Sequence, residues 1–341
     1  MKTYTNLWQE IISFKNLLLA YKKAKKAKPH TNETLSFSLN LEKNLIELQE
    51  ELSNESYKQS KYRVFIIFDP KKRTIKYLPF KDRVVHHAIV NVIESICEKE
   101  FISTSYACRK KKGTHKALKD IKQKIYNKFK EENYCLKGDI KKYFPSINQD
   151  ILKKIISRKI KDKNALNLIY KIIESDHSDF GEHKGIPIGN LTSQLFSNIY
   201  LNELDYYVKQ ELNIKHYYRY VDDFIILEKS KKQLQIYKRK LKYFLKKELK
   251  LELPKEKCNI FKIKDGVDFV GYKIFTNKIL LRKRNIKRFI KRIKDKDSNN
   301  YNSVIYSYLG HFKYANCYFL LQKLFNKYKD NLNINFVRIF S

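Results

Sequence analysis

Two adjacent aspartates, Asp222 and Asp223, interrupt the stretch YYRYVDDFIIL, residues 217–227, which would otherwise be typical of a buried strand. A third aspartate, Asp139, ends the strand-like segment YCLKG at residues 134–138. Aspartate is a common turn residue, so each site has a purely structural explanation when taken alone. If one mixed sheet brings the two sites together, however, the carboxylates can bind divalent cations.

Nucleotidyl transfer is the chemistry that such carboxylates would serve. It uses two divalent ions, about 3.5–4 Å apart, at the attacking and leaving oxygens. Magnesium takes one or two carboxylates and completes its shell with water and substrate phosphates. Because successive side chains in a hairpin point in different directions, we expect Asp222 to share the ions with Asp139 and Asp223 to be more peripheral.

The charge of the chain indicates a polyanionic partner. Among its 341 residues, Lys and Arg number 72 against 36 Asp and Glu, which gives a net charge of +36. Such an excess favours nucleic acid as the partner. The alternative is a lysine content that has risen without a functional cause. Such a rise would not also lower the number of acidic residues. Hydrophobic residues make up 43% of the chain, enough for real cores, so the composition excludes a disordered chain.

The cysteines and the apolar runs indicate a cytoplasmic protein without a membrane partner. Five scattered cysteines form no CxxC pair, which argues against a zinc module and against a disulfide scaffold. No apolar run is long enough to cross a bilayer. The N-terminal segment has helical spacing of its apolar residues and charges among them, so we expect an amphipathic helix there, not a signal peptide.

The spacing of apolar residues predicts an α+β fold. Helices are expected within residues 1–60 (with one near 41–52) and at 81–101, 150–175, 195–212, 231–250, 286–293 and 304–328. Strands are expected at 62–79 and 134–139, as a hairpin around the two aspartates, and as a second hairpin at 259–275 with strand character up to residue 281. The helix after residue 282 has one apolar and one strongly basic face.

Three motifs, in the right order and each in the right kind of element, resemble those of reverse transcriptases. They are GDIKKYFPSI at 138–147, GIPIGNLTSQLFSNIYLNEL at 185–204 and YVDD at 220–223. The resemblance implies a right-hand polymerase with fingers, a palm built on an antiparallel sheet, and a helical thumb. It suggests a helical extension at 1–60, fingers and palm at 61–280, and a basic thumb at 281–341. It also implies two Mg²⁺ ions, dNTPs, a template RNA and a DNA primer or cDNA.

Further segments resemble the reverse transcriptases of diversity-generating retroelements. They are I-G-N-x-x-S-Q at 188–194, PFKDRVVHHAI at 79–89, SYACRKKKGTHKAL at 105–118 and SYLGHFKYAN at 307–316. This resemblance implies error-prone copying, concentrated at template adenines, and a small basic accessory protein. The alternatives are a related bacterial reverse transcriptase of a phage-defence, retron or group II intron system, and a basic RNA-binding protein with a degenerate polymerase fold.

The resemblance assigns roles residue by residue. The metal ligands are Asp139, Asp222, Asp223 and the carbonyl oxygen of Ile140. The nucleotide-binding residues are Arg73 (with Lys71 or Lys72 nearby), Phe144, Ile188, Gly189, Gln194 and Lys257, with Lys255 as a competitor for the last role. The residues for primer and template are Phe269, Gly271, Tyr272, Lys287, Arg288, Lys291 and Arg292.

Within these assignments, Phe144 would exclude a 2′-hydroxyl group, whereas its neighbour Tyr143 fits a core position better. Most of the family has Gln where this chain has Ile188. Isoleucine cannot make the hydrogen bonds of that glutamine, so we expect weaker nucleotide selection. The adjacent histidines His86 and His87 face different directions on a helix, and we interpret them as structural.

Overall fold

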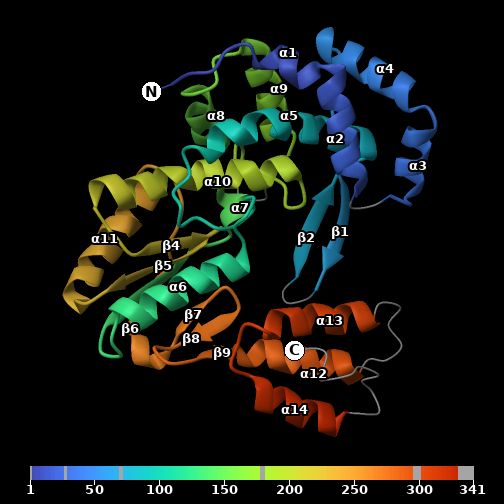
Figure 1. Cartoon of the computed structure of the whole chain (residues 1–341). Coiled ribbons are helices and arrows are strands. Elements are labelled where there is room, and N and C mark those ends of the chain that lie inside the picture. Colours follow the sequence, from blue (N-terminus) through green and yellow to red (C-terminus); the bar gives the residue numbers. More distant parts are fainter. Residues whose placement is uncertain (1, 27–28, 69–71, 177–180, 295–300, 329–341) are drawn as a thin grey trace. The chain divides into compact units, whose positions relative to one another are not determined.

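The computed structural model describes residues 2–26, 29–68, 72–176, 181–294 and 301–328. This part of the chain contains many helices and three antiparallel sheets, in agreement with the expected α+β class (Figure 1). Lys71, one of the candidates beside Arg73, lies outside the described residues, as does the end of the segment 281–341.

The chain forms two compact units, each assembled from three separate segments. The first unit comprises Met1–Ser103, Ile140–Ile214 and Lys240–Pro254, and the second comprises Thr104–Asp139, Lys215–Arg239 and Lys255–Ser341. The division expected from the sequence, at residues 60 and 280, does not coincide with these units. Segments far apart in sequence pair with one another, so the units interleave along the chain. The division into extension, fingers, palm and thumb therefore stays a prediction.

The first unit is mainly helical. Its N-terminal part holds more helices than the sequence suggested: α1 (Leu7–Ile12), α2 (Phe14–Lys26), α3 (Asn32–Leu39) and α4 (Leu41–Ser53). Helix α2 packs along α5 (Phe80–Glu98), with Leu17 and Ala20 fully buried at helical spacing. The Asn16 side chain adds a hydrogen bond of 3.0 Å to the carbonyl oxygen of Ala88. The two-stranded sheet of β1 (Arg63–Ile67) and β2 (Arg73–Tyr77) precedes α5, as expected.

The rest of the first unit carries the motif at 185–204 and residues 140–147 of the motif at 138–147, whose Gly138 and Asp139 belong to the second unit. Its helices are α7 (Tyr143–Ser146), α8 (Gln149–Ser157), α9 (Lys163–Glu174), α10 (Leu191–Tyr206) and a π-helical turn at Tyr207–Glu211. The single helix expected at 150–175 is wrong, because α8 and α9 are separate. Asp162 starts the second of them by accepting a hydrogen bond of 3.1 Å from the amide of Ala165.

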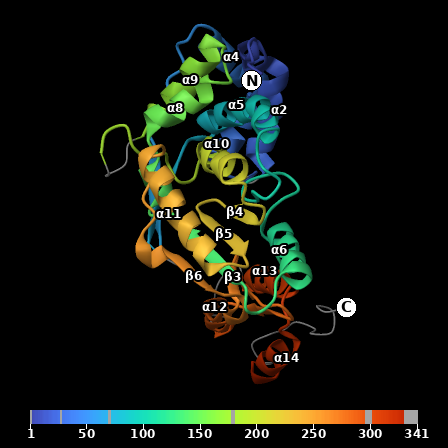
Figure 2. The ribbon, with the colours of Figure 1, turned by 90° about the vertical axis from the view of Figure 1, so that its left-hand side faces the viewer.

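A four-stranded antiparallel sheet organises the second unit, in the order β4 (Tyr217–Tyr220), β5 (Asp223–Glu228), β3 (Tyr134–Asp139) and β6 (Cys258–Lys262) (Figure 2). Helix α11 (Lys231–Lys247) leads from β5 toward β6, and it contributes residues to both units. The single hairpin expected at 259–275 is wrong. Residues 258–262 join the four-stranded sheet, whereas β7 (Val267–Phe269), β8 (Tyr272–Ile274) and β9 (Ile279–Leu281) form a separate three-stranded sheet.

Helices cover these sheets and complete the core of the second unit. They are α6 (Thr114–Lys128), α12 (Lys283–Lys294), α13 (Tyr301–Phe312) and α14 (Tyr318–Lys327). Helix α6 packs along β4, which Figure 2 also shows. One continuous cluster of buried side chains joins α6, the sheets and the three C-terminal helices, and it includes Ile121, Phe269, Phe289 and Phe312.

Gly138 lies where only a glycine fits, directly before Asp139. It stands opposite Phe224 in the β3–β5 ladder, and a Cβ atom would come within 3.0 Å of the fully buried Phe224 ring. We expect Gly138→Ala to lower the free energy of unfolding by about 1–3 kcal/mol, because the ring cannot move without disturbing its neighbours. Urea unfolding measures this change. Gly310→Ala in α13, where no atom lies within 4 Å of the added Cβ, should be neutral or stabilising; equal losses would contradict the packing argument.

Candidate active site at the ends of strands β3 and β5

Strand pairing brings the two acidic sites of the sequence together. Asp139, the last residue of β3, is the ladder partner of Asp223, the first residue of β5. Partners in an antiparallel ladder project their side chains to the same face, so these two carboxylates are neighbours. Asp222 precedes Asp223 in the turn that joins β4 to β5. Asp223, which we expected to be peripheral, is thus the residue paired with Asp139; the division of metal contacts between Asp222 and Asp223 stays a prediction.

The turn that carries Asp222 has an unusual backbone. Val221 has a φ of 55°, which is rare for a β-branched residue and requires support from its surroundings. That support includes Arg219, whose fully buried guanidinium group donates a hydrogen bond of 3.2 Å to the carbonyl oxygen of Val221. The segment 104–106 runs beside Arg219 and exchanges backbone hydrogen bonds of 2.9 and 3.0 Å with it. A buried arginine thus braces the turn between the two strands.

Basic residues already compensate the aspartates. The ammonium group of Lys257 forms an ion pair with Asp139. Lys137 lies 3.6 Å from the Asp223 carboxylate, and it also donates a hydrogen bond of 2.7 Å to the carbonyl oxygen of Asp268. Asp268 in turn forms an ion pair with Arg282, which stands just before α12. A chain of alternating charges therefore connects Asp223 to the β7 strand and to the start of α12.

Burial dominates the protonation of Asp223. Desolvation raises the pKa of its carboxyl group to about 7, although Lys137 and Arg282 act in the opposite direction. Its Oδ1 atom is buried and has no hydrogen-bond partner among the described residues. A divalent cation would satisfy this oxygen and stabilise the charged form, so the residues present fit such an ion.

The three aspartates are nevertheless not assembled into a complete metal site. Across the described residues, no three His, Cys, Asp or Glu side chains are grouped so that they could hold a metal ion. The Asp139 carboxylate is engaged by Lys257, and Asp223 faces Lys137. Two carboxylates suffice for Mg²⁺ when substrate phosphates supply further ligands. Ile140, a buried residue, follows Asp139 directly, and its carbonyl oxygen stays a predicted ligand.

The first unit holds most of the predicted nucleotide-binding residues. The carbonyl oxygen of Ile188 accepts a hydrogen bond of 3.0 Å from the amide of Lys76, so the loop before α10 lies against β2, the strand that begins at Arg73. The same loop bonds to α7, because the amide of Ile186 donates to the carbonyl oxygen of Phe144 at 3.1 Å. Gly189 follows Ile188 in this loop with a φ of 132°.

The predicted nucleotide-binding residues differ in how far their side chains are exposed to solvent. Arg73 and Gln194 are exposed, and Phe144 and Ile188 are half-buried, so all four remain able to contact a ligand. Tyr143 is buried, and its hydroxyl group donates a hydrogen bond of 2.5 Å to the carbonyl oxygen of Ser197, which confirms its structural interpretation.

The predicted primer residues differ in accessibility. Phe269 and Tyr272 are completely buried, so their side chains build the core instead of reaching a nucleic acid. A primer contact at this hairpin would therefore come from the backbone of the turn at Gly271. In α12, Phe289 and Ile293 are buried, whereas Lys287 and Lys291 are exposed and Arg288 and Arg292 are half-buried. The helix thus has the expected apolar and basic faces.

His86 is structural, as we interpreted it. It is buried in α5, and its ring nitrogens lie 2.8 Å from the Thr192 hydroxyl and 3.1 Å from Gln59 Oε1. Burial lowers the pKa of His86 to about 3 and that of His87 to about 4, so both rings are neutral at pH 7.

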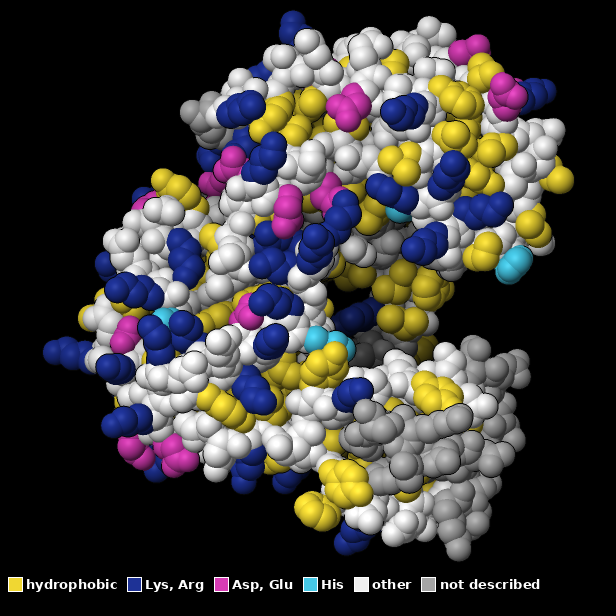
Figure 3. All heavy atoms as spheres, in the orientation of Figure 1, with side chains coloured by type: hydrophobic (Ala, Val, Ile, Leu, Met, Phe, Trp, Pro, Cys, Tyr) yellow, Lys and Arg dark blue, Asp and Glu magenta, His cyan; other side chains and the backbone are white. Residues whose placement is uncertain are grey.

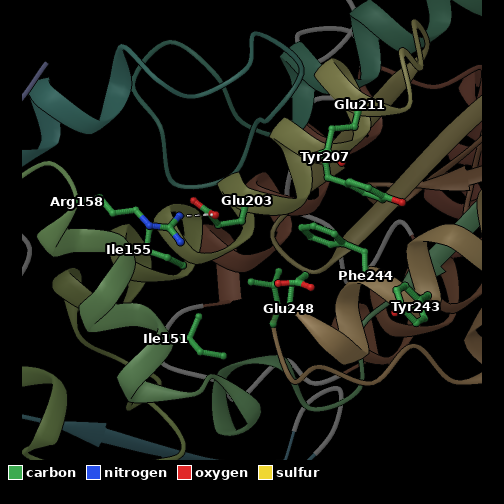
Figure 4. A pocket seen from close by; sticks show the side chains of 10 residues that line it. Ile151, Ile155, Arg158, Glu203, Tyr207, Glu211, Tyr243, Phe244 and Glu248 are labelled. Atoms are coloured by element: carbon green, nitrogen blue, oxygen red, sulfur yellow. Dashed lines mark hydrogen bonds and ion pairs between the residues drawn. The ribbon is translucent and has the colours of Figure 1, made fainter. Parts of the chain in front are cut away.

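A separate hollow of about 380 Å³ lies in the first unit between α8, α10 and α11 (Figure 4). Tyr207 and Phe244 stack at 4.1 Å on one wall, and Arg158 forms an ion pair of 2.8 Å with Glu203 on another. None of the predicted site residues lines this hollow, so we assign it no part in the reaction.

The face drawn in Figure 3 carries many more Lys and Arg side chains than acidic ones, as the net charge requires.

Four residues near the aspartates were not predicted from the sequence to lie there: Lys137, Arg219, Asp268 and Arg282. Lys137 could have been found, because it stands two residues before Asp139 and therefore on the same face of β3. Arg219 carried a weaker signal, a charge inside an apolar strand. The pairing of Asp268 with Arg282 depends on the three-stranded sheet, which no local pattern predicted.

Comparison with known proteins agrees with this site. The family model described as reverse transcriptase (RNA-dependent DNA polymerase) matches residues 58–274, which include the three aspartates. The chain therefore belongs to the reverse transcriptase family, whose catalytic domain has the right-hand polymerase fold.

Several curated proteins are similar to the chain. Protein YkfC of Escherichia coli is 27% identical over 241 residues, covering 60% of this chain and 63% of that protein. The group II intron-encoded protein LtrA of Lactococcus lactis is 30% identical over 289 residues, covering 64% of this chain and 47% of that protein. A 91 kDa protein in a cob intron of Schizosaccharomyces pombe is 27% identical over 230 residues, 63% of this chain and 27% of that protein. The chain thus spans less than two thirds of these relatives.

Among the described residues, no helix combines the length and apolar character that a membrane crossing requires.

Proposed function

We propose that the protein is an RNA-directed DNA polymerase that extends a DNA primer along an RNA template with dNTPs. The observation that carries the proposal is the pairing of Asp139 with Asp223, directly after Asp222, at one end of an antiparallel sheet. Membership of the reverse transcriptase family and the net charge of +36 support the same function.

In this proposal Asp139, Asp222, Asp223 and the carbonyl oxygen of Ile140 hold two Mg²⁺ ions. When bound, these ions activate the 3′-hydroxyl group and stabilise the leaving pyrophosphate. Arg73 binds the triphosphate, since a guanidinium group suits bidentate phosphate contacts. Phe144 packs under the sugar, and Ile188, Gly189 and Gln194 line the pocket for the incoming nucleotide. Lys257 exchanges the Asp139 carboxylate for a phosphate oxygen of the substrate.

Primer extension by the purified protein tests the polymerase directly. The substrate is a labelled DNA primer annealed to an RNA template, with dNTPs and Mg²⁺. We expect elongation to the end of the template, and loss of elongation when EDTA is present or one dNTP is withheld. A protein that binds the same primer–template tightly but never extends it would instead be a basic RNA-binding protein with a degenerate polymerase fold.

The basic face of α12 should make binding depend on salt. Each phosphate contact contributes about 0.9 to the slope of log K against log salt concentration for a B-form duplex. We expect the double substitution Lys287→Ala and Lys291→Ala to reduce this slope by about 2, measured by fluorescence anisotropy with a primer–template between about 50 and 200 mM KCl. The matched control substitutes Lys231 and Lys232, two exposed lysines at the start of α11. An equal change in both variants would remove α12 from the binding surface.

Two more specific roles follow from different observations. The form I-G-N-x-x-S-Q at 188–194 favours an error-prone enzyme of a diversity-generating retroelement, which would work with a small basic accessory protein. Similarity to LtrA and to other intron proteins favours a lineage close to group II intron enzymes. A phage-defence or retron enzyme is a further alternative, and a cytoplasmic location suits all of these roles.

The spectrum of copying errors made by the enzyme distinguishes the diversity-generating role from the intron, phage-defence and retron roles. We expect misincorporation by the wild type to cluster at template adenines, and Ile188→Gln to lower it by about 10-fold, because glutamine can restore hydrogen bonds that isoleucine cannot make. Sequencing of cDNA from one defined template measures both. Ile188→Leu is the matched control, because it keeps the apolar character. An unchanged spectrum in Ile188→Gln would exclude Ile188 as a source of errors, and a low, uniform error rate in the wild type would favour an intron-type enzyme.

A further inference from the structure

The turn between β7 and β8 has a backbone that its own residues do not favour. Phe269 pairs with Tyr272 across the hairpin, so Val270 and Gly271 form a two-residue loop. Their φ values are 43° and 96°, both in the left-handed region. Such loops favour Asn-Gly or Gly-Gly, and a valine at positive φ is an outlier. Contacts from outside the hairpin must therefore hold the turn in this conformation.

Those contacts come from Arg282, directly before α12, and from residues of α12 and α13. The carbonyl oxygen of Gly271 accepts hydrogen bonds from the Asn285 side-chain amide at 3.2 Å and from the Arg282 backbone amide at 3.4 Å. The ring of His311 lies against Gly271, where a Cβ atom would come 2.9 Å from its Cε1 and 3.0 Å from its Nε2. The turn is thus fixed by its carbonyl oxygen and by an imidazole packed on its α-carbon.

The hydrogen bonds of His311 fix the position of its proton. The Tyr272 hydroxyl group donates to the carbonyl oxygen of His311 at 2.7 Å, so its oxygen must accept the hydrogen bond of 2.9 Å from Nδ1. Nε2 is then unprotonated and accepts from the second hydrogen of the Asn285 amide at 3.4 Å. Burial lowers the pKa of His311, which agrees with a neutral ring. Asn285, His311 and Tyr272 form a closed network around Gly271.

Two sequence motifs without an assigned role meet beside this network. His115, from the motif at 105–118, stacks on Tyr314, from the motif at 307–316, with ring centroids 3.9 Å apart. The His115 ring lies 6.4 Å from that of His311. Both stacked rings are exposed, so they border the network on its solvent side.

The turn is also connected to the candidate metal ligands. Lys137, 3.6 Å from the Asp223 carboxylate, donates to the backbone of Asp268, which directly precedes Phe269 in β7. Arg282 pairs with the Asp268 side chain and donates its backbone amide to Gly271. A displaced turn would therefore disturb the lysine and the arginine that face Asp223.

We propose that His311 and Asn285 are positioning residues that hold the Val270–Gly271 turn as the seat for the sugar–phosphate backbone at the 3′ end of the primer. The inference rests on the proposed polymerase function and adds to it two residues and a route by which α12 and α13 control primer alignment. The buried Phe269 and Tyr272 side chains anchor the turn in the core, and the backbone of the turn contacts the primer.

The test compares His311→Ala, Asn285→Ala and the double variant with the wild type, and uses surface His30→Ala as the control. We expect the KM for primer–template to rise about 10-fold in each single variant, with the KM for dNTP unchanged. The double variant should be little worse than either single one, because both residues act on the same turn. Anisotropy should show weakened binding of primed template but unchanged binding of unprimed RNA, and this readout does not depend on catalysis.

Tyr272→Phe is the second variant, since it removes only the hydroxyl group that bonds to His311. We expect a smaller rise in the KM for primer–template, again with the KM for dNTP unchanged. If primer–template KM and primed-template affinity stay at wild-type values in His311→Ala and Tyr272→Phe, the inference is overturned. It is also overturned if primed and unprimed templates lose affinity equally in Tyr272→Phe. A wild type that binds primed template but does not extend it would contradict the polymerase proposal instead, and the affinities would still decide the role of the turn.

Discussion

Asp222→Asn is expected to reduce the rate of nucleotide incorporation by at least about 1000-fold, more than the 10- to 100-fold effect typical of residues that only support a metal ligand. Asparagine keeps the size of the side chain and removes the negative charge that a divalent cation requires. Asp139→Asn should have a similar effect, and it would also free Lys257 from its ion pair.

Single-turnover incorporation of one dNTP into a preformed primer–template complex measures these rates. Asp265→Asn is the matched control, because this carboxylate is exposed and belongs to the short 3-10 helix Ile263–Asp265 in the same unit. It should retain wild-type rates. If Asp222→Asn and Asp265→Asn differ by only a few-fold, the turn aspartate does not bind a catalytic metal.

Phe144→Ala is expected to lower the preference for dNTPs over rNTPs by about 100-fold, through faster incorporation of rNTPs. An aromatic ring under the sugar leaves no room for a 2′-hydroxyl group, whereas the smaller alanine side chain leaves enough room for it. The ring of Phe144 is half-buried, and it packs edge-to-face on Tyr143 with centroids 5.5 Å apart. Tyr143 is fixed by its hydrogen bond to Ser197, so Phe144 has a firm support.

The ratio of kcat/KM for dCTP and CTP on one RNA template measures this preference. Tyr143→Phe removes a hydroxyl group from the support without changing its ring, and we expect it to keep wild-type selection. Loss of selection in Tyr143→Phe but not in Phe144→Ala would assign sugar recognition to the neighbouring position.

The sequence predicted the elements that carry the site because their signals are local. The hairpin around Asp222 follows from an apolar run interrupted by turn residues, and α12 follows from the spacing of Phe289 and Ile293 opposite its basic residues. The two acidic sites could be assigned to one sheet only by resemblance, because strand pairing between residues 139 and 223 leaves no periodic trace.

Features that depend on distant pairing could not be predicted. Residues 258–262 pair with β3 because α11 returns the chain to the free edge of that strand, whereas local alternation placed them in a hairpin with 267–274. The burial of Phe269 and Tyr272 likewise depends on α12–α14, which pack against the three-stranded sheet. The ion pair of Arg282 with Asp268 and the brace that Arg219 forms under Val221 are tertiary contacts of the same kind.

The number of divalent ions bound at the aspartates decides whether Asp139 and Asp222 hold the catalytic metal ions. Mn²⁺ replaces Mg²⁺, and electron paramagnetic resonance counts bound ions in a complex of the protein, a primer–template with a 3′-dideoxy end, and the next dNTP. We expect two ions for the wild type and for Asp265→Asn, and fewer for Asp139→Asn and Asp222→Asn. Equal numbers of bound ions in all four proteins would show that these aspartates do not hold the metal.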